Sequence, residues 1–86
     1  MEERIGFVGI VVENRDAARQ VNEILSDFGD MIRGRIGIPD PQNGVSVITV
    51  IVYCTSDKLG AMTGRLGNLP NVQIKSALTQ AKINKE

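Results

Sequence analysis

Residues 45–55, VSVITVIVYCT, decide the fold. They are rich in β-branched residues and predict a long strand. Successive side chains of a strand point to opposite faces, so one face carries Val47 and Ile51. The other face carries Ile48 and Val50. Apolar side chains on both faces indicate a central strand that is covered on both sides.

The stretch Arg4–Val12, RIGFVGIVV, has the same property. Phe7 and Val11 lie on one of its faces, and Val8 and Ile10 lie on the other. The sequence therefore predicts two central strands, each apolar on both faces.

Two helices are predicted between the strands. The first follows Asn14 or Asp16 as its cap and ends at Gly29. Its apolar residues recur every three or four positions, as one helical face requires: Ala17, Ala18, Val21, Ile24, Leu25 and Phe28. The second is capped by Thr55 or Ser56. Its apolar stripe is Leu59, Met62 and Leu66.

Two further strands, Met31–Pro39 and Val72–Leu78, alternate between apolar and polar residues, which is typical of edge strands with one wet face. In the first of them we expect Ile32, Gly34, Ile36 and Ile38 on one side and Arg33, Arg35 and Gly37 on the other. The turn Asp40–Gly44 follows it.

The order strand, helix, strand, strand, helix, strand predicts an α+β, ferredoxin-like βαββαβ fold. We expect an antiparallel four-stranded sheet with two helices on one face, formed by residues 1–78, and a polar C-terminal tail over residues 79–86. Two helices cover only one sheet face. We therefore expect the open face to be covered by another copy, in a dimer or a tetramer, or by a partner protein.

Composition excludes several classes of protein. The 86 residues contain one cysteine and no histidine, so we expect no disulfide, no metal site and no cofactor. Ten basic and ten acidic residues give a formal net charge of zero, so we expect no direct binding to nucleic acid. No apolar run is long enough for a membrane span, and Met1–Arg4 does not resemble a signal peptide. We expect a cytoplasmic protein that is not an enzyme.

Two places could bind a small anion. The loop residues Asn14, Arg15 and Asp16 precede the first helix, whose N-terminus attracts negative charge. The alternative is a simple helix cap. Arg33 and Arg35, expected on one face of an edge strand, could clamp a carboxylate or phosphate. The alternative is a charged edge that prevents unwanted strand pairing.

Two other features favour structural interpretations. Cys54 has no histidine to activate it, so we interpret it as a small apolar residue of a central strand. Gly60–Gly67, GAMTGRLG, lacks the lysine of a phosphate loop and lies within a helix, so we interpret it as a site of close helix packing.

Nearly the whole chain, from Arg4 to Leu78, resembles the family of iron-only hydrogenase system regulators. The most specific pieces are the runs Gly34–Pro39, GRIGIP, and Leu59–Val72, LGAMTGRLGNLPNV. More distantly, the chain is similar to the ACT-like C-terminal domain of nickel-responsive repressors. The nickel site of those repressors depends on histidines, so the resemblance does not carry it over.

The resemblance implies an ACT-type fold, self-association and a regulatory role linked to hydrogenase. ACT domains place an effector, often an amino acid, beside the loop after the first strand, which corresponds here to Asn14–Ala17. We therefore expect a homo-oligomeric regulatory module that senses a small molecule or docks on a partner protein. The alternatives are a small dimeric α/β-barrel enzyme without metal and a purely structural assembly module.

Overall fold

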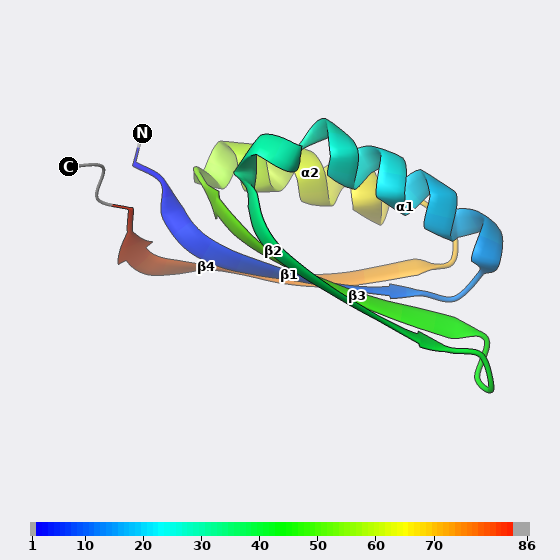
Figure 1. The fold of residues 1–86 in the computed structure, drawn as a ribbon. Coiled ribbons are helices and arrows are strands. Elements are labelled where there is room, and N and C mark those ends of the chain that lie inside the picture. Colours follow the sequence, from blue (N-terminus) through cyan, green and yellow to red (C-terminus); the bar gives the residue numbers. More distant parts are fainter. Residues whose placement is uncertain (1, 84–86) are drawn as a thin grey trace.

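The computed structural model describes residues 2–83 and has two layers, a sheet and a pair of helices (Figure 1). The elements, in chain order, are β1 (Arg4–Val12), α1 (Arg15–Asp27), the short 3-10 helix η1 (Gly29–Met31), β2 (Ile32–Asp40), β3 (Val45–Cys54), α2 (Ser56–Gly67) and β4 (Val72–Lys82). The four strands are antiparallel in the order β2-β3-β1-β4. The predicted ferredoxin-like topology, with β1 and β3 in the centre, is confirmed.

Each helix begins at a side-chain cap. The Oδ1 atom of Asn14 accepts a hydrogen bond from the backbone N–H of Asp16 at 2.8 Å. The hydroxyl of Thr55 accepts one from the backbone N–H of Lys58 at 3.3 Å. In each case the cap is the earlier of the two predicted candidates, because that residue still has an extended backbone. At the other end of α1, Gly29 opens η1.

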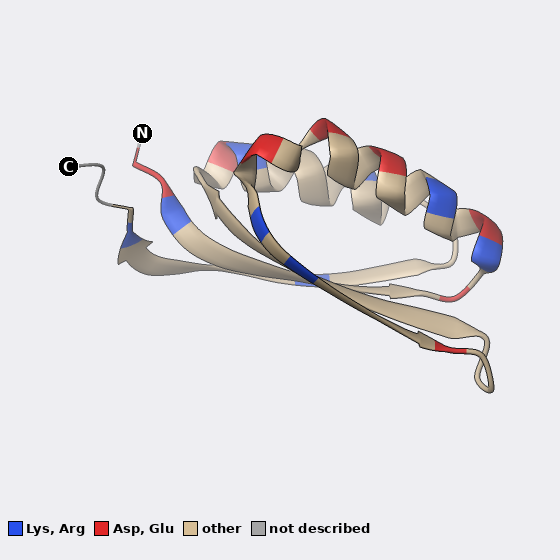
Figure 2. Cartoon of the chain, viewed as in Figure 1, with Lys and Arg blue, Asp and Glu red and all other residues tan. Residues whose placement is uncertain are grey.

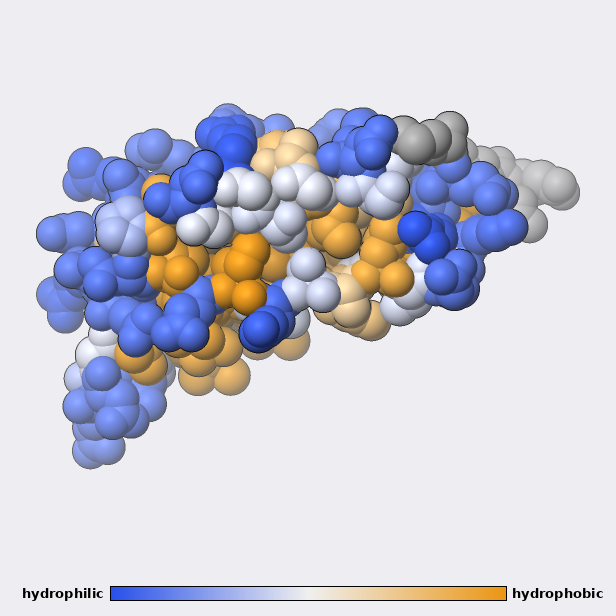
Figure 3. All heavy atoms as spheres, turned by 180° about the vertical axis from the view of Figure 1, so that it is seen from behind, coloured by the Kyte–Doolittle hydropathy of each residue, from blue (hydrophilic) through white to orange (hydrophobic). Residues whose placement is uncertain are grey.

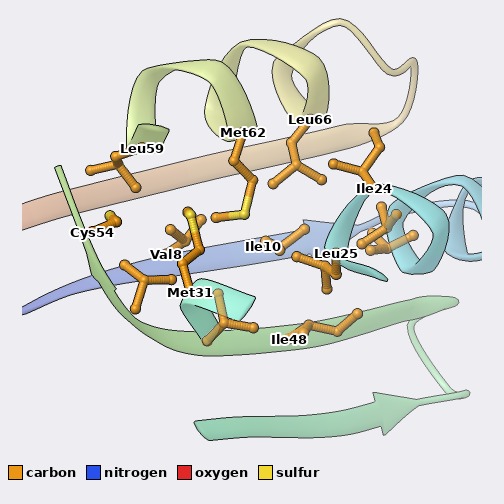
Figure 4. Close-up of a cluster of buried hydrophobic side chains, with 14 of the residues drawn as sticks. Val8, Ile10, Ile24, Leu25, Met31, Ile48, Cys54, Leu59, Met62 and Leu66 are labelled. Atoms are coloured by element: carbon orange, nitrogen blue, oxygen red, sulfur yellow. The ribbon is translucent and has the colours of Figure 1, made fainter. Parts of the chain in front are cut away.

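The core lies between the helices and one face of the sheet (Figure 4). Alternate residues of β1 and β3 are buried there against the apolar stripes of both helices. The largest fully buried side chains are Ile10, Leu25, Met62, Leu66, Val8, Val21, Val50, Val52 and Cys54. The helices are also joined at their surface, where Arg65 of α2 forms an ion pair of 2.9 Å with Asp27 of α1. The helix layer thus covers the sheet face that carries Val8 and Val50.

The last strand is longer than predicted. β4 continues beyond Leu78 to Lys82, so the prediction of a polar tail is wrong for residues 79–82. The hydroxyl of Thr79 donates to the backbone carbonyl of Ile5 at 2.6 Å, and the backbone N–H of Ile83 donates to the carbonyl of Glu3 at 2.9 Å. Polar side chains are compatible with this strand because it is an edge exposed to water. The remaining tail residues, 84–86, lie outside the described part of the chain.

A β-bulge interrupts β2 near its start. Ile32 pairs with Val52, but Gly34 pairs with Ile51, so two steps along β2 correspond to one step along β3. The extra residue is Arg33. The bulge therefore places Ile32 on the opposite face from Gly34, and the expectation that they share a face is wrong. From Gly34 onward the predicted alternation holds.

Gly6 tests how tightly the central strand packs. A Cβ atom added there would lie 2.8 Å from the carbonyl oxygen of Ala77 and 3.0 Å from Cδ1 of Leu78. We expect Gly6→Ala to lower the free energy of unfolding by about 1–3 kcal/mol, because the backbone oxygen of β4 cannot move without breaking the ladder. Urea unfolding at one fixed protein concentration measures this.

The matched control is Gly37→Ala in β2, where the added Cβ would meet no atom within 4 Å. This control should be neutral or slightly stabilising, because alanine restricts the unfolded chain. Equal losses for both variants would contradict the packing at Gly6.

Candidate functional site

A hollow of about 310 Å³ lies where the start of α1 meets the β2–β3 hairpin. β1 ends at Val12, and the chain turns through Asn14 into the helix. Opposite, the hairpin turns from Asp40 to Gly44, whose φ of 69° lies in the left-handed region that glycine adopts without strain. The hollow is lined by Val12, Asn14, Arg15, Ala18, Pro39, Asp40, Pro41, Gly44, Val45 and Ser46. Its volume is at the lower end of the range for small-molecule sites.

Charges of both signs border this hollow. Arg15 makes no ion pair within residues 2–83, so its guanidinium is available to an anion. The Asp40 carboxylate accepts hydrogen bonds from the backbone and side-chain amides of Asn43, the shorter at 2.8 Å. The Asn14 side-chain oxygen is occupied by its capping bond. The amides of Asp16 and Ala17 both donate to Asn14, so the available groups are the Arg15 cation on one side and the Asp40 anion on the other.

The structure brings two of the five predicted site residues to this hollow. They are Asn14 and Arg15; Asp16, in the first turn of α1, is not part of its lining. Sequence reasoning missed Asp40, which it treated only as a turn residue. No signal in the sequence pointed to it, because β2 ends at Asp40 and is separated from β1 by β3.

Arg33 and Arg35 do not form a clamp. The bulge places Arg33 on the same face as Tyr53, with its guanidinium carbon 5.2 Å from the centroid of that ring. Arg35 pairs with the buried Val50, and its guanidinium donates to Oδ1 of Asn22 on α1. The two cations therefore lie on opposite sides of the sheet. The expectation that they share a face is wrong because the bulge shifts the alternation by one residue.

The sheet face away from the helices is apolar and unusually exposed. Phe7, Ile36, Ile38, Val47 and Ile51 are between 38% and 63% accessible. We call this surface, formed by the outward side chains of all four strands, the open face. Charged residues gather on the helices, and the strands are mostly uncharged apart from a few basic positions (Figure 2), while apolar atoms follow the lower margin of the sheet (Figure 3). A monomer rarely exposes so many large apolar side chains together.

Cys54 lies in the core with no accessible surface. Burial raises the pKa of its thiol above the ordinary value of 9.0, and the charge of Glu3 raises that pKa further, while Lys58 lowers it. A thiol held in its neutral form is a poor nucleophile. The interpretation of Cys54 as an apolar core residue agrees with this position.

The glycine-rich run of α2 is not a site of close packing. Added Cβ atoms at Gly60 and Gly64 would meet nothing within 4 Å. The apolar stripe of α2 faces the sheet, so these glycines lie on the solvent side of the helix. The interpretation of this run as a close helix contact within the chain is wrong.

No three histidine, cysteine, aspartate or glutamate side chains cluster in a way that could hold a metal ion within the described residues. Over the same residues, no helix combines the length and hydropathy needed to cross a membrane.

The buried thiol predicts how stability depends on pH. Unfolded chains release the thiol proton near pH 9, whereas the folded chain retains it to higher pH. The stabilisation is therefore complete below that pH and is lost as the pH rises further, by at most about 1.4 kcal/mol per pH unit. Urea unfolding at pH 8 and pH 10 should show a larger loss for the parent chain than for Cys54→Val. Parallel losses would contradict a raised thiol pKa.

Comparisons with known proteins identify the family and the fold. The family model described as "TM1266-like: Iron-only hydrogenase system regulator, putative" matches residues 4–76. The chain is similar to the solved structure of the uncharacterized protein TM1266 from Thermotoga maritima, at 35% identity and a TM-score of 0.89, over 92% of this chain and 100% of that chain. A search of curated proteins found no match.

A second solved structure is similar in fold alone. It is the ACT domain from GTP pyrophosphokinase of Chlorobium tepidum, at 19% identity and a TM-score of 0.74, over 87% of this chain and 99% of that chain. The topology, the similarity to solved structures over most of the chain and the family match lead to one conclusion. The chain belongs to the TM1266-like family of iron-only hydrogenase system regulators and has an ACT-type, ferredoxin-like fold.

Proposed function

We propose that this chain is a regulatory module of an iron-only hydrogenase system that works as a homo-oligomer and senses a small molecule. The family supports the regulatory role. The observation that carries the proposal is the open face, where five large apolar side chains remain exposed after the two helices have packed. We place this module in the cytoplasm, on the strength of its composition.

Self-association follows from the cost of leaving the open face in water. Each large apolar side chain moved from water into a packed interface contributes about 1.5–3 kcal/mol when fully buried. β1 and β3 are the central strands, so their outward residues Phe7, Val47 and Ile51 lie in the middle of the face. A second copy presents the same kind of surface and covers them without any partner of different chemistry.

The sensed molecule enters the hollow between α1 and the β2–β3 hairpin. Arg15 binds a carboxylate, and Asp40 on the opposite side binds an ammonium group. An α-amino acid carries both groups on the same carbon. The hollow faces one end of the sheet, so binding there can influence how a second copy sits on the open face.

A regulatory role fits this arrangement better than catalysis. The only thiol is buried in its neutral form, and the chain has no histidine to serve as a general base. The remaining groups at the hollow, a cation and a carboxylate, are suited to binding. A purely structural module would leave the charged hollow without a role.

The open face provides the first test. Ile51→Lys places a charge in the middle of the proposed interface, and we expect it to weaken association at least tenfold, because an unpaired lysine loses hydration when buried. Sedimentation equilibrium across micromolar concentrations measures this.

The matched control is Ala61→Lys on the exposed surface of α2, which should associate like the parent chain. A parent chain that sediments as a monomer across this range would remove the assembly proposal.

The hollow provides the second test. Thermal-shift measurements with a panel of amino acids and small carboxylates should show stabilisation by at least one amino acid. Arg15→Ala should weaken that binding about tenfold or more, because it removes a charge-assisted hydrogen bond.

Arg19→Ala removes the same charge from α1 but lies outside the hollow, so it should bind like the parent chain. If no member of the panel shifts the parent chain, the sensing part of the proposal fails and docking on a partner protein replaces it.

A further inference from the structure

Two neighbouring rows of side chains cross the middle of the open face. The strand register places Gly34, Ile51, Phe7 and Ala77 side by side in the first row, in the order β2-β3-β1-β4. The second row, one step along in every strand, contains Ile36, Thr49, Gly9 and Lys75. Both rows point away from the helices, because the residues between them in β1 and β3 are buried in the core.

The two rows are complementary in size on every strand. Where the first row has a large side chain, the second row has a smaller one on the same strand. Where the first row has a small side chain, the second row has a larger one. On β1 the pair is Phe7 and Gly9; on β2 it is Ile36 and Gly34. On β3 the larger residue is Ile51 beside Thr49, and on β4 it is Lys75 beside Ala77.

Gly9 leaves a depression that the chain itself does not require. An added Cβ atom there would have only the carbonyl oxygen of Lys75 nearby, at 3.8 Å, which is an ordinary contact. The depression above Gly9 measures about 230 Å³, and its lining includes Val11, Val47 and Lys75. Two residues away on the same strand and face, Phe7 is 44% exposed. A protruding ring and an empty depression therefore lie next to each other.

We propose that a second copy of this chain covers the open face with its two-fold axis running across the strands, between the two rows. This inference rests on the self-association proposed above and specifies its geometry. The axis places the first row of one copy over the second row of the other. Phe7 then fills the depression over the partner's Gly9, and Ile36 lies over the partner's Gly34. The reciprocal contacts are the same, as a two-fold interface requires.

The other simple arrangement packs less well. An axis along the strands, between β1 and β3, would place each row over itself. Phe7 would then meet the partner's Ile51, and Gly9 would face the partner's Thr49. Large residues would hold the sheets apart, and voids would remain between the small residues. Both overpacking and voids destabilise a protein interior. Sheets stacked about 10 Å apart need side chains that interdigitate, which only the axis across the strands supplies.

The face is large enough, and its two middle rows carry little charge; Arg33 lies on the same face beyond them, beside Tyr53. Four strands about 4.8 Å apart and four outward positions about 6.8 Å apart give roughly 500 Å² per copy, or roughly 1,000 Å² for the pair, near the lower limit for a specific interface. Lys75 is the only charged residue of the two rows. It belongs to the edge strand β4, so its ammonium group can reach water while its stem packs over the partner's Ala77.

The experiment exchanges the two side chains on β1. We expect Gly9→Phe alone and Phe7→Gly alone each to weaken dimerisation at least tenfold, measured by sedimentation equilibrium. The double variant carrying both substitutions restores a ring facing a depression, so it should bind at least tenfold more tightly than the product of the two single effects allows. Gly37→Phe is the control, because Gly37 also has open space for a Cβ atom but points to the other sheet face. It should dimerise like the parent chain.

A second exchange on β2 keeps the test decisive if Phe7→Gly does not fold. Gly34→Ile with Ile36→Gly swaps the same two rows at a different strand, and the added Cβ at Gly34 makes only ordinary contacts, the nearest at 3.6 Å. A dimeric parent chain with purely additive single effects, or with no effect of Gly9→Phe, overturns the proposed axis and leaves self-association standing. A monomeric parent chain overturns both.

Discussion

The two central strands are apolar on both faces, and the two helices can cover only one of these faces. Val8 and Val50 are buried under the helices, whereas Phe7 and Ile51 on the same strands remain partly in water. Within residues 2–83, the two helices pack on one face of the sheet and no other element lies on the opposite face. The helices and the buried thiol belong to the core on the first of these faces. The other face leaves large apolar side chains exposed, and the proposed self-association rests on it.

Much of the fold could be predicted from local pattern, because the pattern and the final packing agree. Apolar residues on both faces of β1 and β3 predicted their central position, and the spacing of apolar residues in α1 predicted its buried side. One error occurred where a local irregularity of the backbone changed which face the side chains occupy. The bulge at Arg33 reversed the faces of Ile32 and Gly34, and no residue type in that stretch signals a bulge unambiguously. β4 was predicted too short because its last residues, 79–82, lack an apolar alternation. An edge strand exposed to water does not need one.

The candidate site was harder to predict than the fold. Asn14 and Arg15 could be found because a helix N-terminus is visible in sequence. Asp40 could not, since its position opposite Arg15 depends on how the β2–β3 hairpin lies against the start of α1. Pairing of charges across a hollow is a property of three-dimensional structure. The same holds for the row pattern on the open face, which appears only when the registers of three strand pairs are combined.

The bulge in β2 makes that strand sensitive to length. Its extra residue sets which face every later side chain of the strand occupies, so Arg35 reaches Asn22 of α1 while Ile36 lies outward. Loss of one residue between Met31 and Gly34 would not be absorbed locally: either the strand would slide by a full step against β3, or a cation and an isoleucine would exchange sides. Natural sequence variation in this part of the chain should therefore take the form of substitutions, with insertions and deletions confined to the hairpin loop beyond Asp40.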